Sequence, residues 1–192
     1  MPIPNPDALS FLQTRRSRPA KTLAPPVPDA PALRNLLTAA ARTPDHGKLE
    51  PWRFIVIEKN AMSRLADSVE ARGTELALAP DQITKGRVQF DQGHLAVAVI
   101  EVQKTSEKIP ALEQTYSAGA VCLALLNAAL AAGWGANWLS GWPSHDPDFR
   151  SKALGLAENE RIAGFIHIGT ETATPPERPR PDLDAITEWL DG

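Results

Sequence analysis

The sequence has little cysteine and no strong excess of charge of either sign. Its single cysteine, Cys122, lies in an apolar run, which excludes a disulfide framework and a cysteine-rich metal site. The net charge of −3, with 20 basic residues scattered along the chain, provides no field that would attract nucleic acid. A reducing, cytoplasmic setting without a nucleic-acid partner is therefore expected.

Membrane and metal-binding signals are also missing. The N-terminus has no basic stretch followed by an apolar core, so no signal peptide is expected. Charged residues are absent from Gln114 to His145, but the run is rich in alanine and interrupted by Asn127 and Asn137. It falls short of the ~20 strongly apolar residues of a membrane span. The four histidines lie in different segments without metal-ligand spacing, so no metal site is expected.

A chain of 192 residues can form one domain with a substantial core. No repeat or low-complexity linker divides it, so a single domain over residues 1–192 is predicted. The tail, residues 171–192, begins with an extended proline-rich stretch. Its apolar residues are Leu183, Ile186, Trp189 and Leu190. Such a tail rarely ends in solvent, and it is expected to pack on a second subunit.

Capping signals predict the helices. Asn5 caps a first helix that is expected to continue through Arg18, until Pro19 stops it. Asp29 caps a second helix that ends at Arg42, and Asn60 is expected to cap a third. A short helix is predicted over 81–90. The longest, over 112–132, is apolar on nearly every side, so it must be buried either within the domain or against a second subunit.

Continuous apolar runs predict strands over 52–57, 95–100 and 161–169. The first of these is expected in the middle of a sheet, because its successive apolar residues require cover on both faces. The segment 133–143 is predicted to be a strand that leads into a pocket wall. The segment 21–31 carries four prolines and is predicted to be a surface connection.

The loop from Arg42 to Phe54 joins a helix to a strand and carries several charges. Pro44 and Pro51 restrict its backbone, so it is expected to be stiff. A stiff loop that presents Arg42 and His46 can aim donors at an anion or a polar ring. The alternatives are a solvated connection and, for His46, a side chain that only caps the loop by bonding a backbone carbonyl.

The run Arg15-Arg16-Ser17 at the end of the first helix is a candidate phosphate clamp, because a guanidinium fork matches phosphate oxygens two at a time. The alternative is that the arginines complement the negative end of the helix. Gly133-Trp134-Gly135 follows a helix and is therefore no dinucleotide fingerprint. Ser140 lacks a nucleophile elbow, which argues against a hydrolase. His167 is expected to be a satisfied core histidine.

Four segments in the same order resemble the FMN-dependent nitroreductase family, in particular its short YdjA-like branch. They are Arg15-Arg16-Ser17, Arg42-x-Pro44-x-His46, Pro51-Trp52-x-Phe54 and Gly133-Trp134-Gly135-Ala136-Asn137-Trp138. The resemblance covers nearly the whole chain. It implies an α+β fold, with a mostly antiparallel sheet flanked by helices, and a homodimer with FMN sites at the subunit interface.

The resemblance also implies roles for individual residues. Arg15, Arg16 and Ser17 look like the clamp on the FMN phosphate and ribityl chain, and Arg42 and His46 look like flavin contacts. The strand end Trp138-Leu139-Ser140 looks like the segment that approaches the flavin from the other subunit. Leu139 stands where relatives often have an arginine. Arg178 and Arg180 match the basic tail that reaches the phosphate, and Lys85 or Arg42 could place a cation near flavin N1.

The chemistry implied is a ping-pong transfer, in which NADH or NADPH reduces the flavin, which then reduces a nitro-aromatic, a quinone or a similar acceptor. The cofactor carries this chemistry, so no catalytic side chain is expected. Two alternatives stay open on the same scaffold, oxidative dehydrogenation and reductive dehalogenation. A non-catalytic interaction protein that docks through its proline-rich tail is a third alternative.

Overall fold

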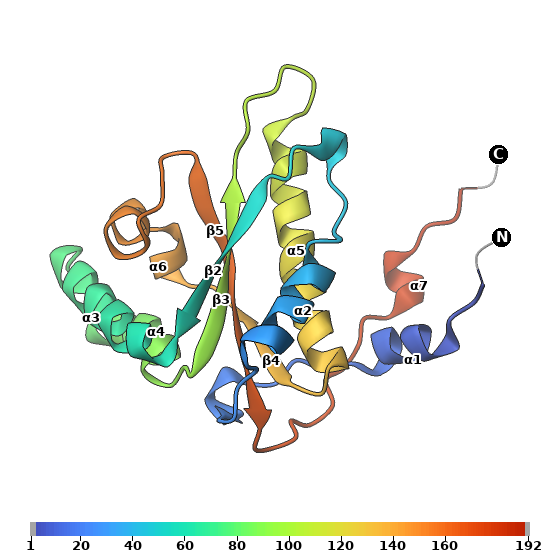
Figure 1. Cartoon of the computed structure of the whole chain (residues 1–192), viewed down its shortest axis with the longest axis horizontal. Helices are drawn as coiled ribbons and strands as arrows, with labels where there is room; N and C mark the ends of the chain where they lie inside the picture. Colours follow the sequence, from blue (N-terminus) through green and yellow to red (C-terminus); the bar gives the residue numbers. More distant parts are fainter. Residues whose placement is uncertain (1–2, 191–192) are drawn as a thin grey trace.

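The structure is a computed structural model that describes residues 3–190. Its centre is an antiparallel sheet in the order β1-β5-β3-β2, with β4 pairing with another part of β5 (Figure 1). The strands are β1 (Leu23–Ala24), β2 (Trp52–Glu58), β3 (Leu95–Val102), β4 (Gly135–Leu139) and β5 (Glu160–Glu171). The expected α+β class with an antiparallel sheet is confirmed.

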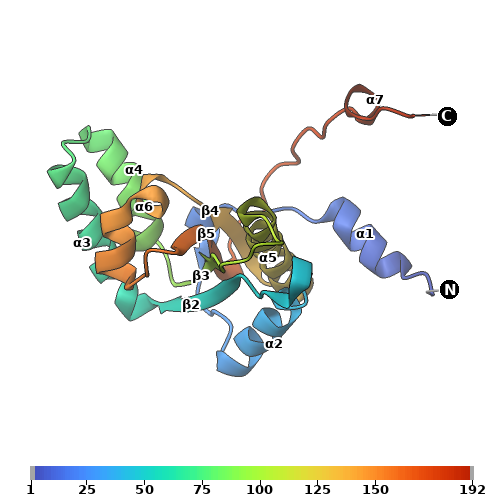
Figure 2. The ribbon, with the colours of Figure 1, turned by 90° about the horizontal axis from the view of Figure 1, so that it is seen from above.

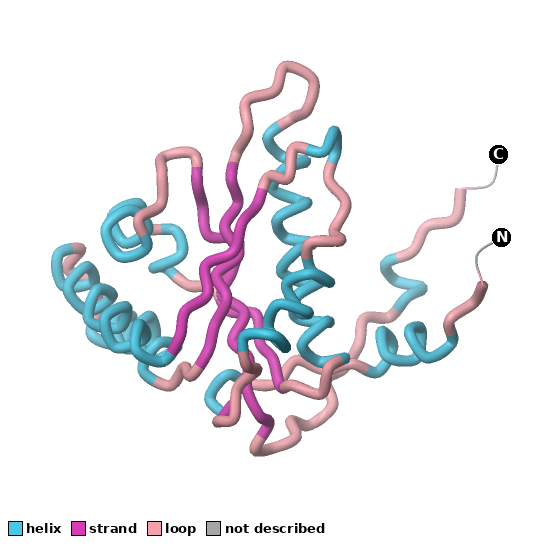
Figure 3. The backbone as a smooth tube through the Cα atoms, viewed as in Figure 1, coloured by secondary structure: helices cyan, strands magenta, loops and turns pink. Residues whose placement is uncertain are grey.

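Helices cover both faces of this sheet, so the strands pass between two groups of helices (Figure 3). One face carries α2 (Ala30–Ala40) and α5 (Ala111–Ala131). The other carries α3 (Lys59–Glu75), α4 (Pro80–Asp91), α6 (Trp142–His145) and the π-helical turn η3 (Phe149–Ala153). Each face buries its own apolar core, and short 3₁₀ turns η1 (Ala20–Thr22) and η2 (His46–Lys48) lie in the connections.

Local capping signals placed two helix starts correctly. The Asn5 side chain accepts the amide of Ala8 at 3.0 Å at the start of α1 (Pro6–Thr14), and Asp29 accepts the amide of Ala32 at 2.9 Å at the start of α2. Capping oxygens satisfy amides that have no partner within the helix. The predicted long helix and the strands over 95–100 and 161–169 are also present.

Three local predictions are wrong. Helix α1 ends at Thr14 and does not reach Arg18, since Arg15 is already extended at φ −55° and ψ 143°. Helix α3 begins at Lys59, one residue before the expected cap, because Glu58 ends the preceding strand directly. The segment 21–31 is more than a surface connection, because it contains the end of η1 and all of β1, which pairs with the end of β5.

Strand β2 was expected in the middle of the sheet but lies at its edge. Among the described residues it pairs only with β3. Val56 on this strand is 40% exposed, so one apolar face of β2 is left open. The apolar pattern requires cover, but in a single chain that cover is incomplete.

Helix α5 is buried on the sides that face the sheet and α2, but not on all sides. Its exposed stripe follows the helical period and consists of Leu112, Tyr116, Ala120 and Leu123. The sequence predicted that this helix is buried either within the domain or against a second subunit. Within the single chain, its burial is incomplete. By length and hydropathy alone α5 could cross a membrane, but in this fold it packs as a core helix on the sheet.

Both terminal segments extend away from the domain. Figure 2 shows α1 and α7 (Leu183–Ile186) reaching out on one side, beyond α5. Leu9 and Leu12 on α1 are more than half exposed, although their apolar pattern predicted a packed face. The apolar residues of the tail are exposed as well.

Candidate functional site

Four arginines gather where the chain leaves α1. Arg15, Arg16 and Arg18 follow the helix directly, and Arg180 comes to them from the C-terminal tail. The Arg15 guanidinium donates to the Ser17 hydroxyl at 2.9 Å. The structure thus brings together most of the expected phosphate clamp. Arg178 lies in the same tail and is exposed, and its side chain makes no hydrogen bond or ion pair within residues 3–190.

The sheet holds this arginine cluster in place. The amide of Arg18 donates to the carbonyl of Ala136 on β4 at 2.8 Å, and the Asn137 side chain donates to the carbonyl of Arg18 at 2.7 Å. The Arg18 side chain pairs with Glu171 at the end of β5 at 3.0 Å. Sequence reasoning gave no role to Asn137, and only its place in the predicted strand next to the clamp could have suggested one.

The electrostatics of the cluster favour a bound anion. Burial lowers the pKa of Arg15, and the nearby charges of Arg180, Arg16 and Arg18 lower it further. The Nε atoms of Arg15 and Arg16 are buried and have no hydrogen-bond partner within the described chain. Buried donors without acceptors are costly and rare. A phosphate oxygen would satisfy them and neutralise the clustered charge, so these residues fit the phosphate of FMN.

A cavity of about 350 Å³ lies next along the chain. The chain runs from the cluster through Ala20 and Lys21 into its wall, and the end of β4 contributes Leu139 and Ser140. Helix α4 supplies Lys85 on the opposite side. Three predicted site residues therefore line one cavity, together with Lys21, which no sequence signal indicated. Apolar walls with two lysines suit a planar ring with a polar edge.

Trp138 does not line this cavity. Successive residues of a strand point to opposite faces, and Trp138 lies on the face away from Leu139. Its indole packs so closely on Gly164 of β5 that an added Cβ there would overlap the indole nitrogen. Ser140 is exposed, and its hydroxyl lies 3.4 Å from Nε2 of His145.

The loop between α2 and β2 is fixed to the start of α5. Ser117 donates to the carbonyl of Pro44 at 2.9 Å, and Nδ1 of His46 lies 2.6 Å from a carboxylate oxygen of Glu113. Within the loop, Lys48 and Glu50 have positive φ angles of 53° and 46°. Non-glycine residues in this region are strained and are found disproportionately at functional sites. The stiffness predicted for this loop is therefore supported, but His46 bonds a carboxylate and not a backbone carbonyl.

The loop and the arginine cluster lie at opposite ends of α5 (Figure 1). The loop contacts Ser117 near the helix start, whereas the cluster is held by β4, which follows the helix end. At 1.5 Å per residue, the helix from Ser117 to Ala131 separates them by about 20 Å. One chain therefore does not bring Arg42 and His46 to the clamp. Arg42 is exposed at the end of α2.

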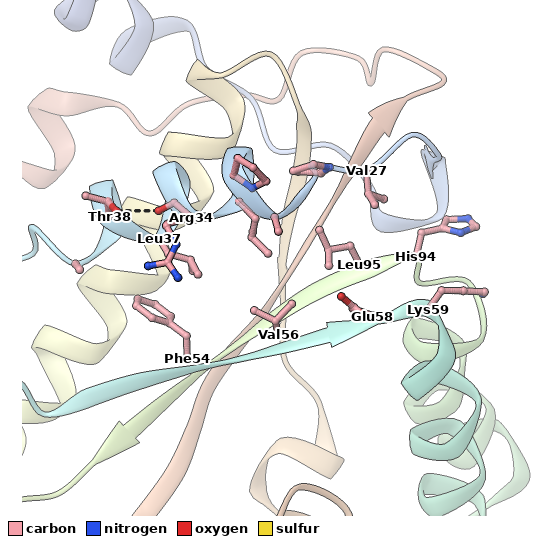
Figure 4. A pocket seen from close by; sticks show the side chains of 15 residues that line it. Val27, Arg34, Leu37, Thr38, Phe54, Val56, Glu58, Lys59, His94 and Leu95 are labelled. Atoms are coloured by element: carbon pink, nitrogen blue, oxygen red, sulfur yellow. Dashed lines mark hydrogen bonds between the residues drawn. The ribbon is translucent and has the colours of Figure 1, made fainter.

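Two other features lie outside this assembly. A cavity of about 980 Å³ is a groove between α2 and β2, where Leu37 lies across from Phe54 and Val56 (Figure 4). His167 is a core residue, as expected, but its Nε2 has no partner within residues 3–190. Burial lowers the pKa of His167 to about 4, so its imidazole stays neutral near pH 7.

Comparisons with known proteins show the family of this chain. A model of the Nitroreductase family matches residues 12–170. The chain belongs to the nitroreductase family. It is 36% identical to YdjA of Escherichia coli K12, over 85% of this chain and 88% of that protein, and YdjA is named as a candidate NAD(P)H nitroreductase. A similarly named protein of Haemophilus influenzae is 34% identical, with the same coverage. Membership of this family makes the chain an oxidoreductase.

Solved structures share the fold. A nitroreductase-like protein from Bacillus cereus superposes with a TM-score of 0.81 at 23% identity and covers 100% of both chains. A nitroreductase-type protein from Desulfovibrio desulfuricans, solved with FMN, gives 0.75 at 20% identity, covering 99% of this chain and 100% of that one. NfnB of Mycobacterium smegmatis, an FMN-dependent nitroreductase solved with NADPH, gives 0.75 at 17% identity, covering 96% and 98%.

Proposed function

We propose that this nitroreductase-family protein binds FMN and uses NADH or NADPH to reduce a nitro-aromatic, a quinone or a similar acceptor in the cytoplasm. The observation that carries the proposal is the arginine cluster, whose buried Nε donors of Arg15 and Arg16 lack acceptors. Relatives named as NAD(P)H nitroreductases, and the fold neighbours solved with FMN and with NADPH, support the same cofactors.

When bound, FMN supplies the redox chemistry, accepting hydride from the nicotinamide and passing electrons to the acceptor in a ping-pong sequence. The residues of this chain bind and orient. Arg15, Arg16, Ser17 and Arg180 would hold the phosphate, with Arg178 as a second cation from the tail. The ring would enter the cavity beside Leu139 and Ser140, where Lys85 offers a positive charge to its polar edge. No side chain is needed as a catalytic acid or base for hydride transfer.

We further propose a homodimer in which each FMN site is completed by the second chain. The exposed stripe of α5, with Leu112, Tyr116 and Leu123, is the surface that a second copy would cover. Within one chain, the part of α5 from Ser117 to Ala131 keeps the loop about 20 Å from the arginine cluster. A two-fold axis can instead bring the loop of one chain to the arginine cluster of the other. Arg42 and His46 would then contact the flavin held by the partner.

An absorption spectrum of the purified protein tests the cofactor, because bound flavin colours the protein yellow. Anaerobic titration with NADH and with NADPH then tests the reductant. The nicotinamide that the protein uses should bleach the absorption band of the flavin. Adding a quinone or a nitro-aromatic should restore the band. Colourless protein that does not bind added FMN would contradict the proposal.

A further inference from the structure

His46 and Glu113 form an imidazole–carboxylate pair where the loop between α2 and β2 meets the start of α5 (Figure 1). Nδ1 of His46 lies 2.6 Å from Oε2 of Glu113, which stands in the first turn of the helix. The other ring nitrogen, Nε2, makes no hydrogen bond within residues 3–190. A carboxylate that accepts from Nδ1 fixes the tautomer and the orientation of the ring. When the ring is protonated, Nε2–H is therefore left as a directed proton donor.

The backbone around His46 is held in place without help from the imidazole. Gly47 has a φ of 74°, and Ile109 packs on it so closely that an added Cβ would overlap the isoleucine side chain. The amide of Glu50 donates to the Asp45 carboxylate at 3.1 Å. The His46 side chain is 61% exposed, and an exposed ion pair contributes little to stability. The pair therefore orients the ring and is not needed to fold the loop.

The imidazole lies beside an open hollow of about 380 Å³. The titratable groups that line this hollow with His46 are Asp45 from its own loop and Glu113 and Tyr116 from α5. Asp45 already accepts an amide, so Glu113 is the acid that pairs with the ring. Tyr116 and Ala120 also belong to the exposed stripe of α5, so the second copy in the proposed homodimer would close the hollow. An aromatic side chain and a proton donor suit a flat ring that carries a carbonyl oxygen.

The loop that packs on Gly47 brings further charges near the pair but none that bonds His46. This loop, residues 103–110, carries Lys104, Glu107 and Lys108, and all three are exposed. None of them makes an ion pair with His46 within the described part of the chain. Glu113 is therefore the partner that sets the direction of the imidazole.

We propose that His46 is a catalytic acid that protonates a quinone acceptor at the flavin site of the partner chain, and that Glu113 is its positioning residue. This inference rests on the proposed function. Hydride transfer needs no side-chain acid, but a quinone that has gained a hydride is left as a hydroquinone anion. The hydride and its two electrons come from N5 of reduced FMN, which is thereby oxidised. The Nε2–H bond of His46 breaks and an O–H bond forms, which gives neutral hydroquinone. His46 then regains a proton from water.

Rapid mixing of the anaerobically reduced protein, saturated with FMN, tests the proton donor. His46→Gln should return the flavin band at least about tenfold more slowly than the wild type when the acceptor is a benzoquinone, because general acids contribute about a hundredfold or more. Ferricyanide takes up electrons without a proton, so with this acceptor the two proteins should react at the same rate. Reduction of the flavin by the nicotinamide should also be unchanged. Lys48→Gln removes a charge from the same loop and is the control, with unchanged rates for both acceptors.

Nitrogen NMR of the apoprotein tests the role of Glu113 without the flavin. In the wild type, the neutral ring of His46 should carry its proton on Nδ1, where the carboxylate accepts it. Glu113→Leu removes the acceptor, so the proton should no longer be confined to Nδ1, and the quinone step should slow. Glu113→Gln keeps an acceptor oxygen and should preserve the wild-type tautomer. A tautomer that is the same in Glu113→Leu as in the wild type would overturn the positioning role.

Mixed dimers test whether His46 acts on the flavin of the other chain. One chain carries His46→Gln, and the other carries Arg15→Ala with Ser17→Ala, so that each homodimer lacks a complete site. In the mixed dimer, the clamp of the first chain meets the intact His46 of the second. The flavin bound there should react with the quinone at the wild-type rate. A rate as slow as that of the His46→Gln homodimer would overturn the transfer between chains.

The outcomes separate this inference from the proposed function. If His46→Gln is reduced normally and passes electrons to the quinone as fast as the wild type, the catalytic acid is refuted and the proposed function stands. Equal slowing with ferricyanide and with the quinone would also refute it, because a changed flavin potential would then explain both rates. A wild-type protein that binds no FMN would overturn the proposed function and the proton donor together.

Discussion

Replacing Arg15 and Ser17 together with alanine is the sharpest test of the arginine cluster. A hydrogen bond to a charged group contributes about 1.5–3 kcal/mol. The two side chains bond each other at 2.9 Å, so their effects should overlap and not add fully. A net loss of about 3 kcal/mol would weaken FMN binding roughly a hundredfold.

The stability of the apoprotein should not fall with the affinity for FMN. Burial and, after it, the nearby arginine charges lower the pKa of Arg15, which means that its positive charge is opposed in the folded protein. Removing it relieves this repulsion, so the melting temperature of the apoprotein should stay the same or rise. Arg64→Ala with Ser68→Ala is a control of the same composition on α3, and should leave FMN affinity unchanged. Full flavin affinity in the Arg15 and Ser17 double variant would refute the clamp.

Two further predictions concern assembly and pH. Ala120→Asp should prevent dimerisation, because an unpaired charge buried between subunits costs several kcal/mol. Ala71→Asp, on the exposed surface of α3, is the control and should leave the dimer intact. Sedimentation measures both variants, and a wild-type protein that sediments as a monomer at micromolar concentration would contradict the proposed interface. His167→Leu should stabilise the protein more at pH 5 than at pH 8. From pH 6.5 down to about 4, the unfolded chain protonates this histidine and the folded chain does not, which lowers the free energy of unfolding by at most about 3 kcal/mol. Urea unfolding of the wild type and of His167→Leu at both pH values measures this effect. An equal difference in free energy of unfolding between the two proteins at pH 5 and at pH 8 would refute the prediction.

Signals that act within a few residues were readable from the sequence. The caps at Asn5 and Asp29 depend only on a side-chain oxygen and an amide three residues later. The buried stripe of α2 follows from helical periodicity in the same way. Such features need no knowledge of the rest of the fold, which is why they were placed correctly.

The position of β2 could not be read in this way, because an apolar pattern records that a face is covered and not what covers it. Phe54 and Val56 require cover, and the single chain leaves them beside an open groove. For this reason the strand over 52–57 was predicted to lie in the middle of the sheet. The same limit applies to α5, whose exposed Tyr116 and Leu123 indicate burial that one chain does not supply.

The site was only partly predictable for a similar reason. Arg15, Arg16 and Ser17 stand together in the sequence, so their common role was visible. The meeting with Arg180 depends on the path of the tail, and the contact of Asn137 with the main chain of Arg18 depends on how β4 lies beside that segment. Both are long-range consequences of packing that no local pattern encodes.

His46 shows how the structure sharpens a choice that the sequence left open. Its Nδ1 lies 2.6 Å from Glu113, but both side chains are largely exposed, and exposed pairs contribute only about 0–1 kcal/mol. The loop is held instead by the bond from Ser117 to Pro44, which His46→Ala leaves intact.

The apoprotein of His46→Ala should therefore melt as the wild type does. If His46 contacts the flavin of the partner, the substitution should weaken FMN binding or shift its reduction potential. Lys48→Ala, in the same loop, controls for a general change of charge. A large fall in apoprotein melting temperature, with unchanged FMN affinity and potential, would instead assign His46 a purely structural role, because only a contact within the chain could then explain the loss.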